Sequence, residues 1–131
     1  MQQKIEQNKE SIVFGNDSIA VRKCLADIQG GRTLDVEGYT EDVIKVLHVI
    51  IKKSDGSYAP MPVSGKAYAS LPEGAAYVGL LKNTILTKKP AAAILTYGTV
   101  NETLVPYPMS GIMAAFKAAC PHITFEKDEE A

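Results

Sequence analysis

The two histidines are the residues of this sequence best suited to bind a metal or to transfer a proton. His48 lies within the apolar run VLHVIIKK, and His122 directly follows Pro121. Neither has a second histidine or a carboxylate at the spacing that a metal site uses. We therefore expect structural roles for both histidines, and we expect no metal and no cofactor.

Candidate nucleophiles and phosphate-binding loops are equally weak. Ser18 stands beside Asp17 in the polar turn GNDS, where a serine is far more often a cap than a nucleophile when no histidine base is near. The sequence contains neither a G-x-S-x-G elbow nor a G-x-x-x-x-G-K phosphate loop. The GGR stretch at residues 30–32 is expected to give flexibility, because no helix start follows it. We expect that the protein is not an enzyme, and a pocket that gathers Asp17, Ser18 and His48 would contradict this.

The charge balance and the cysteines restrict the possible partners. The 131 residues include 14 basic and 15 acidic side chains, so the chain has no one-sided positive field for nucleic acid or an anionic membrane. No apolar run approaches the roughly 20 residues that span a bilayer, and the N-terminal MQQKIEQNKE lacks the apolar core of a secretory signal. Cys24 and Cys120 form no C-x-x-C pair and are typical of free thiols in a reducing compartment, with Cys120 as a small packed residue. We expect no nucleic-acid partner and no membrane partner.

The elements that position functional residues begin with a polar N-terminal arm. Apart from Met1 and Ile5, the first ten residues are polar or charged, a composition that buries too little surface to offset the entropy of ordering. An apolar triplet at residues 12–14 follows, and two interpretations stay open: it packs on its own domain, or it docks and becomes ordered against a partner. The second interpretation gives these candidate partner-binding residues: Ile12, Val13, Phe14, Ile19 and Val21. We divide the chain into an arm and docking segment, residues 1–32, and a compact β domain with an acidic tail, residues 33–131.

Strand patterns dominate the next part of the chain. RTLDVEGYT alternates apolar and polar residues, as a half-buried strand does, and TEDVIKV is expected to open one helical turn capped by Thr40. VLHVIIKK is β-branched, and the Asp55-Gly56 pair after it predicts a hairpin into SYAPMPV. Pro60 and Pro62 lack amide donors, so this return strand is expected at a sheet edge or breaks into irregular backbone. SGKAYASLPEG is predicted to be a loop that contains a turn.

Two apolar strands and one helix are predicted in the second half. The run VGLL at residues 78–81 suits burial on both faces, and Gly79 within it indicates the close approach of another backbone. AAAILTYG is predicted to pair with this run and to end at Gly98. MSGIMAAFKAAC predicts a helix capped by Ser110, whose apolar face consists of Ile112, Ala115, Phe116 and Ala119. HITFEK is a final short strand, so the expected fold class is mainly β (α+β) with one short C-terminal helix.

The apolar strands also predict self-association. A chain of this length covers two buried sheet faces poorly by itself, so we expect it to form homotrimers. The candidate interface residues are Val78, Leu80, Ile94 and Tyr97.

The stretches YVGLLKN, KPAAAILTYGTVNETLVPYP and FKAACPHITF, in this order, resemble the core of the lambda-type head decoration proteins of tailed phages. DSIAVRK, GGRTLDVEGYT and MPVSGKAYASLPEG resemble the phage head fibre proteins of bacterial prophages. The resemblance covers residues 12–128. It implies a small β-barrel or tulip-like decoration domain in a non-enzymatic capsid accessory protein, commonly a trimer seated on the outside of the shell at three-fold positions. The implied partners are the major capsid protein and other copies of the chain, and the implied location is the virion capsid surface after synthesis in the bacterial host cytoplasm.

The chain departs from the lambda-type pattern in its longer N-terminal region, its acidic end, and the lysine pairs at residues 52–53 and 88–89.

An alternative function is a host-surface or glycan-binding adhesion module of a head fibre. In that case the tyrosines Tyr58, Tyr68 and Tyr107 would stack on sugars.

Overall fold

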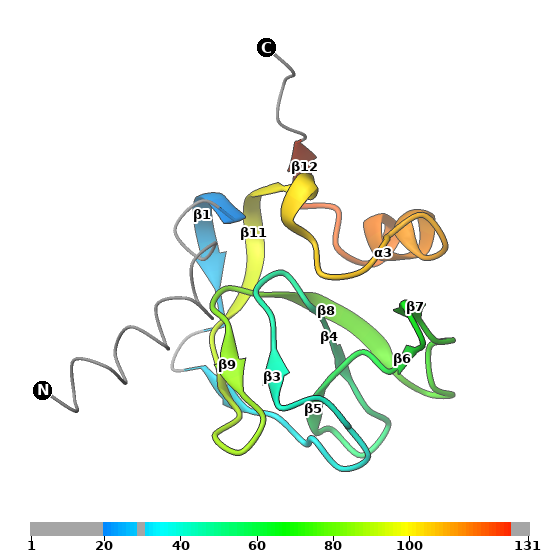
Figure 1. The fold of residues 1–131 in the computed structure, drawn as a ribbon. Coiled ribbons are helices and arrows are strands. Elements are labelled where there is room, and N and C mark those ends of the chain that lie inside the picture. Colours follow the sequence, from blue (N-terminus) through cyan, green and yellow to red (C-terminus); the bar gives the residue numbers. More distant parts are fainter. Residues whose placement is uncertain (1–19, 29–30, 127–131) are drawn as a thin grey trace, which may run out of the picture.

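The computed structural model describes residues 20–28 and 31–126. The described part is mainly β with a single α-helix, as the strand patterns predicted (Figure 1). The strands are β1 (Val21–Asp27), β2 (Arg32–Thr33), β3 (Val43–Ile44), β4 (Val49–Lys52), β5 (Tyr58–Pro60), β6 (Val63–Ser64), β7 (Ala67–Tyr68), β8 (Ala76–Leu81), β9 (Ile85–Leu86), β10 (Ala91–Ala92), β11 (Ile94–Asn101) and β12 (Ile123–Glu126). The helices are the 3-10 turn η1 (Glu102–Leu104) and α3 (Met113–Ala119).

One six-stranded sheet holds the domain together. Its strands lie in the order β1-β11-β8-β4-β5, and β12 pairs with β11 in parallel. Three two-stranded sheets complete the described strands, β10 with β2, β3 with β9, and β6 with β7. None of these sheets closes on itself within residues 20–28 and 31–126, so the barrel that the resemblance implied is not seen there.

The predicted pairing of the two central apolar strands is confirmed. Leu80 of β8 lies opposite Leu95 of β11, and β8 also pairs with β4 on its other side. A Cβ atom on Gly79 would overlap the carbonyl oxygen of Leu95, which confirms the predicted close approach. The second strand does not end at Gly98 as predicted, because β1 pairs with it as far as Val100 and β12 as far as Asn101.

Both faces of the central strands are buried within one chain. On one face the core packs beneath α3, and its buried side chains include Val49, Ile51, Leu80, Leu95 and Phe116. On the other face the core consists of Leu34, Ile44, Ile50, Leu81, Ala92 and Ile94, and it is closed by the short sheets that contain β2, β3, β9 and β10. The run at residues 78–81 is therefore two-sided as predicted, and the covering elements belong to the same chain.

The hairpin predicted at Asp55-Gly56 joins β4 to β5. Gly56 has a positive φ of 90°, and the Asp55 carboxylate accepts hydrogen bonds from the backbone N–H and the hydroxyl of Ser57. These are the interactions that make Asp and Gly suitable for such turns. β5 lies at the end of the sheet order, which confirms the edge position that Pro60 predicted.

Three local predictions in residues 32–70 are wrong. The expected helical turn near Thr40 is replaced by β3, whose Val43 lies opposite Leu86 of β9. The expected strand at RTLDVEGYT is only two residues long, and the loop predicted at SGKAYASLPEG contains the hairpin of β6 and β7. In each case the partner is a short strand that local propensity does not reveal. The turn predicted within that loop is present, because the Ala75 N–H donates to the Pro72 carbonyl and Gly74 has a φ of 78°. Leu47, which is fully buried at the bend between β3 and β4, adopts a left-handed φ of 70°.

The predicted helix exists, but its boundary and its buried face differ from the prediction. α3 begins at Met113, and Ile112 occupies its N-cap position without a side-chain capping hydrogen bond. Ser110 is therefore not the cap. Phe116 is fully buried in the core, whereas Ala115 and Ala119 are exposed. The larger apolar side chains turn inward because they bury more area than alanines do. Cys120 is buried, as predicted for a packed residue.

Candidate functional site

The candidate partner-binding residues fall in two groups. Ile12, Val13, Phe14 and Ile19 lie outside the described residues. Val21 is the first residue of β1, where it lies opposite Val100 of β11 and packs partly buried against the core. The last part of the segment that the sequence assigned to the arm is therefore a strand of the main sheet.

Of the four candidate interface residues, only Tyr97 presents a broad surface. Leu80 and Ile94 have no exposed surface at all, and Val78 is half-buried against the second core. Tyr97 is 45% exposed, and with Leu25, which is 54% exposed, it makes up the exposed large hydrophobic residues of the described chain. The two fully buried side chains stabilise the monomer and are not available to another copy.

Tyr97 and Leu25 lie on the neighbouring strands β11 and β1, at one margin of the main sheet. β1 stands at one end of the sheet order, and its residue Ala26 lies opposite Tyr97 of β11. Every residue from Arg22 to Asp27 is exposed. We call this margin, the strand β1 together with Tyr97, the β1 edge. His122 stacks on Tyr97 with ring centroids 5.0 Å apart, a contact that the sequence did not suggest.

Two ion pairs tie β1 to the rest of the domain. Arg22 Nη1 lies 3.1 Å from Glu126 Oε1 in β12, and Lys82 Nζ donates a 2.7 Å hydrogen bond to Asp27 Oδ2. The second interaction raises the pKa of Lys82, chiefly through the hydrogen bond to the carboxylate. Exposed pairs of this kind each contribute little stability, about 0 to 1 kcal/mol, so their main effect is to fix the position of β1.

A second feature is a buried histidine among three tyrosine rings. His48 has no exposed surface, and its ring meets those of Tyr39, Tyr68 and Tyr107 edge to face, at centroid distances of 5.7, 5.2 and 5.8 Å. We call these four residues the His48 cluster. Edge-to-face contacts of this type are favourable because the positive edge of one ring meets the negative face of the next.

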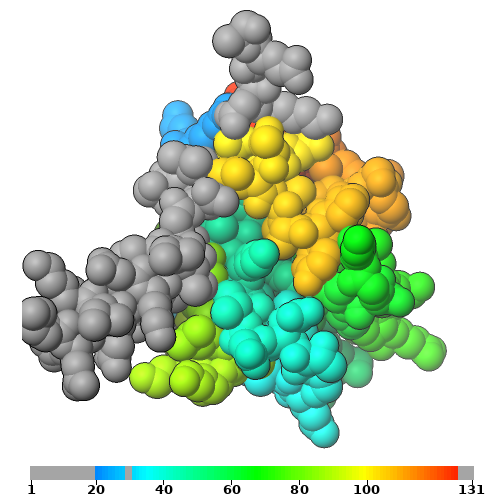
Figure 2. Space-filling model, in the orientation of Figure 1, coloured from blue at the N-terminus to red at the C-terminus, as the bar shows by residue number. Residues whose placement is uncertain are grey.

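Each tyrosine of the cluster is placed by a different local device. The backbone N–H of Tyr39 donates to the Val36 carbonyl and closes a turn in which Gly38 has a φ of 82°. The Tyr68 hydroxyl accepts a 3.1 Å hydrogen bond from the Val49 N–H. Tyr107 stands between two prolines, 106 and 108. Figure 2 shows that the cyan, green and yellow-orange segments that carry these residues meet on one face of the molecule.

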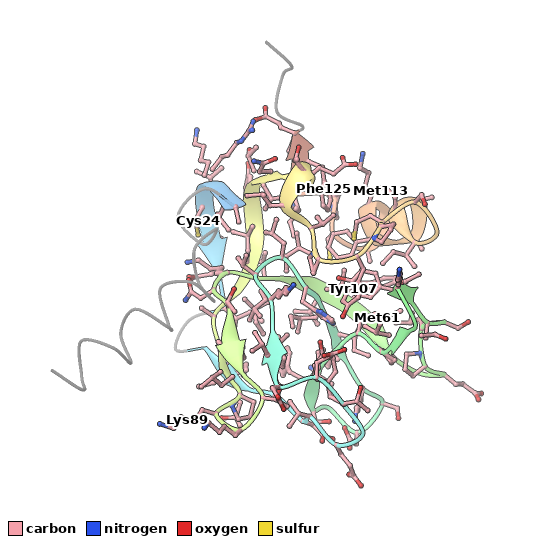
Figure 3. All side chains as sticks on the ribbon, viewed as in Figure 1. Cys24, Met61, Lys89, Tyr107, Met113 and Phe125 are labelled. Atoms are coloured by element: carbon pink, nitrogen blue, oxygen red, sulfur yellow. The ribbon has the colours of Figure 1, made fainter. Side chains whose placement is uncertain are left out.

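The hydrogen bonds of His48 assign its tautomer. Nε2 lies 3.0 Å from the backbone carbonyl oxygen of Met61, which can only accept, so Nε2 carries the proton. Met61 and Tyr107 lie near each other in Figure 3, consistent with their shared contact to this ring. Nδ1 is buried and has no hydrogen-bond partner among the described residues. The ring therefore keeps one unused lone pair.

Burial keeps the His48 cluster uncharged at neutral pH. Desolvation lowers the pKa of His48 to about 4, with the Met61 hydrogen bond opposing the shift. Desolvation also raises the pKa of both Tyr39 and Tyr68 above its ordinary value of 10.0. A neutral imidazole and neutral phenols can donate and accept hydrogen bonds but hold no charge.

A pocket of about 250 Å³ adjoins the cluster. Its lining includes Tyr39, Glu41, Asp42, Lys45, His48 and Tyr107. A second hollow of about 610 Å³ shares Tyr39 and Glu41 with it and continues along Pro60 and Pro62. Tyr68 and Tyr107 were predicted from the sequence as sugar-stacking residues, and the structure brings both to His48. Tyr58 lies elsewhere, with Arg32 and Lys52 at 5.6 and 5.7 Å from its ring.

Within residues 20–28 and 31–126, no three His, Cys, Asp or Glu side chains gather in a way that could hold a metal ion. No helix in the same part of the chain is long and apolar enough to cross a membrane. Asp17 and Ser18 lie outside the described residues, so their distance from His48 is not defined.

No known protein family, curated protein or solved structure matches this chain.

Proposed function

We propose that this chain is a structural virion protein that binds the outside of a phage capsid as a homotrimer at three-fold positions. Its partners are the major capsid protein and its own copies, and it acts on the capsid surface after synthesis in the bacterial cytoplasm. It carries out no catalysis. Its role is to stabilise or decorate the head.

The observation that carries the proposal is that the stretches that resemble decoration proteins pair and pack with one another in the fold. Those stretches supply β8, β11, α3 and β12. β8 and β11 are antiparallel neighbours, β12 joins β11 in parallel, and α3 packs against β8. The three stretches are short and apolar when taken singly, but the four elements that they supply build one continuous unit, and this supports their interpretation as the core of a single decoration domain. We include the tulip-like arrangement of that domain in the proposal.

The position of β1 supports docking through the arm. The segment with Ile12, Val13, Phe14 and Ile19 leads directly into β1, at the margin of the main sheet. A segment attached at a sheet margin can reach a neighbouring protein while the domain stays folded. If it adds a strand to a capsid loop, the backbone hydrogen bonds supply affinity and alternate side chains supply register.

Three-fold symmetry suits this mode of binding. A trimer at a three-fold lattice point presents three equivalent arms to three equivalent capsid sites. Weak contacts then add through multivalency, and any protein that binds only the intact shell stabilises it by mass action.

The test uses heads of the phage or prophage that encodes this chain, prepared from a strain in which the gene is deleted. Purified full-length chain should bind these heads and add density at three-fold positions in electron micrographs. A variant that lacks residues 1–19 should stay folded, because Ala20 is buried and Val21 pairs with Val100, but it should lose head binding. Undiminished binding by this variant would refute docking through the arm, and heads without vacant three-fold sites would refute the function.

A glycan-binding adhesion module is the second candidate function. The meeting of Tyr68 and Tyr107 at His48 favours it, because two of the three tyrosines suggested for sugar stacking lie beside one pocket. Glycan-array binding without any binding to heads would select this function over capsid decoration.

A further inference from the structure

We propose that the pocket beside the His48 cluster binds one uncharged sugar ring, which stacks on a tyrosine and donates a hydroxyl hydrogen bond within the pocket. This inference deepens the second candidate function and does not depend on capsid binding. A decoration protein that carried such a pocket would hold a saccharide on the outside of the head.

The first argument is the unused hydrogen-bonding capacity of His48. Nδ1 is the one buried side-chain nitrogen or oxygen of the described residues that has no hydrogen-bond partner. Leaving such an atom unpaired costs about 1 to 3 kcal/mol, and a ligand that pairs it would recover this cost. Because His48 has no exposed surface, the tyrosine rings around it must move apart before a ligand reaches Nδ1. Since Nε2 carries the proton, Nδ1 can only accept, and the complementary ligand group is a donor.

The second argument is the mixed charge of the lining. Glu41 and Asp42 contribute carboxylates, Lys45 contributes an ammonium group, and the cluster itself is neutral. The two carboxylates oppose an anion such as phosphate, and Lys45 opposes an organic ammonium ion. A hydroxyl both donates and accepts, so a ring with several adjacent hydroxyls can satisfy acceptors and donors at once.

The third argument is the size of the pocket and the type of surface it offers. About 250 Å³ lies below the roughly 300 to 1,000 Å³ of sites for drug-sized ligands, and this suits a single ring. Tyr39 and Tyr107 supply the amphipathic ring surfaces on which the C–H face of a sugar packs. The adjoining hollow, which shares Tyr39 and Glu41, provides room for a second sugar unit along the chain of a glycan.

The experiment is NMR titration of the isotope-labelled full-length chain with methyl glycosides of glucose, galactose, mannose and N-acetylglucosamine. At least one glycoside should bind with a dissociation constant of about 1 mM, the affinity of a small polar ligand, and should shift the amide signals of residues 39–45 and 107. Inorganic phosphate and methylammonium serve as comparison ligands. If none of the glycosides shifts these signals, or if phosphate or methylammonium binds there in preference, the inference is wrong.

Three variants test whether the glycoside binds in this pocket. Tyr107→Ala should weaken glycoside binding about ten-fold by removing a stacking surface. Asp42→Asn changes an exposed side chain, so it keeps the fold, and it should weaken binding by a similar factor through the loss of a charged acceptor. Tyr58→Ala, at the tyrosine that lies outside the pocket, should bind as the original chain does. Equal affinities in all three variants would overturn the assignment to this pocket, whereas head binding should be the same in each.

Discussion

An imidazole that is enclosed by three tyrosine rings loses the water that would stabilise its protonated form. The folded chain therefore holds the pKa of His48 at about 4, below the ordinary value of 6.5 that applies to the unfolded chain. Between these two values the unfolded state binds more protons than the folded state. Stability that is fully present above pH 6.5 is thus lost as the pH falls toward 4.

We expect the free energy of unfolding to fall by as much as about 3 kcal/mol across this interval through His48 alone, an order-of-magnitude figure from the size of the shift. Urea denaturation at several pH values between 7 and 4 would measure it. His48→Gln keeps an amide donor for Met61 but does not titrate, so its stability should depend less on pH. Equal slopes for the original chain and His48→Gln would contradict this account.

At the scale of elements, the pairing of β8 with β11 depends on a residue without a side chain. A Cβ atom on Gly79 would overlap the Leu95 carbonyl oxygen and approach the Ile94 side chain. Because backbone atoms of a central strand cannot move aside without breaking the ladder, Gly79→Ala should destabilise the domain by about 3 kcal/mol. The measurement is the midpoint of thermal unfolding.

Gly111→Ala is the matched control for that variant. No atom lies within 4 Å of the Cβ position at Gly111, which stands before α3. Its stability should stay within about 0.5 kcal/mol of the original chain. Similar losses at both positions would show that the close approach of β8 and β11 is not the cause.

The elements that the sequence predicted are those whose pattern is local. The β-branched run of β4, the Asp55-Gly56 turn and the apolar runs of β8 and β11 carry their signals within a few residues. β3 carries no such signal, since its two residues become a strand only through pairing with β9 more than forty positions later. The position of Ser110 was a weak guide to the start of α3, because packing of Phe116 decides where this short helix lies.

At the scale of the whole molecule, the sequence could not predict which apolar residues stay exposed. Leu80 and Ile94 were expected at an interface because the chain is short, but elements of the same chain bury both: Leu80 lies in the core beneath α3, and Ile94 lies in the core closed by the short sheets. The His48 cluster also depends on the tertiary fold, since its tyrosines are spread along the sequence and meet only when β7 and the loops around 39 and 107 are in place. The tyrosines could be proposed as sugar-binding residues from their chemistry, but the histidine beside them could not.

The exposed pair at the β1 edge leads to a prediction about assembly, which is part of the proposed function. If the trimer forms through this surface, Leu25 and Tyr97 supply its apolar centre. The original chain should then have about three times the monomer mass by light scattering at micromolar concentration. The double variant Leu25→Glu, Tyr97→Glu should weaken association at least about ten-fold and shift the mass toward the monomer.

Lys66→Glu, in the exposed turn between β6 and β7, controls for a general effect of added negative charge and should remain trimeric. A double variant that stays trimeric would place the interface elsewhere. An original chain that is monomeric in solution would contradict self-association before the capsid is reached.

The parallel pairing of β12 with β11 has a consequence for biosynthesis. These strands are joined through η1 and α3, so the ribosome must translate some twenty further residues before the second half of β11 receives its neighbour. A nascent chain that stalls in this interval exposes the backbone of β11 from Gly98 to Asn101, a ready template for aggregation. Slow codons in this interval, or ribosome-associated chaperones that bind the nascent chain there, would therefore affect the yield of soluble protein more than at other stages of translation.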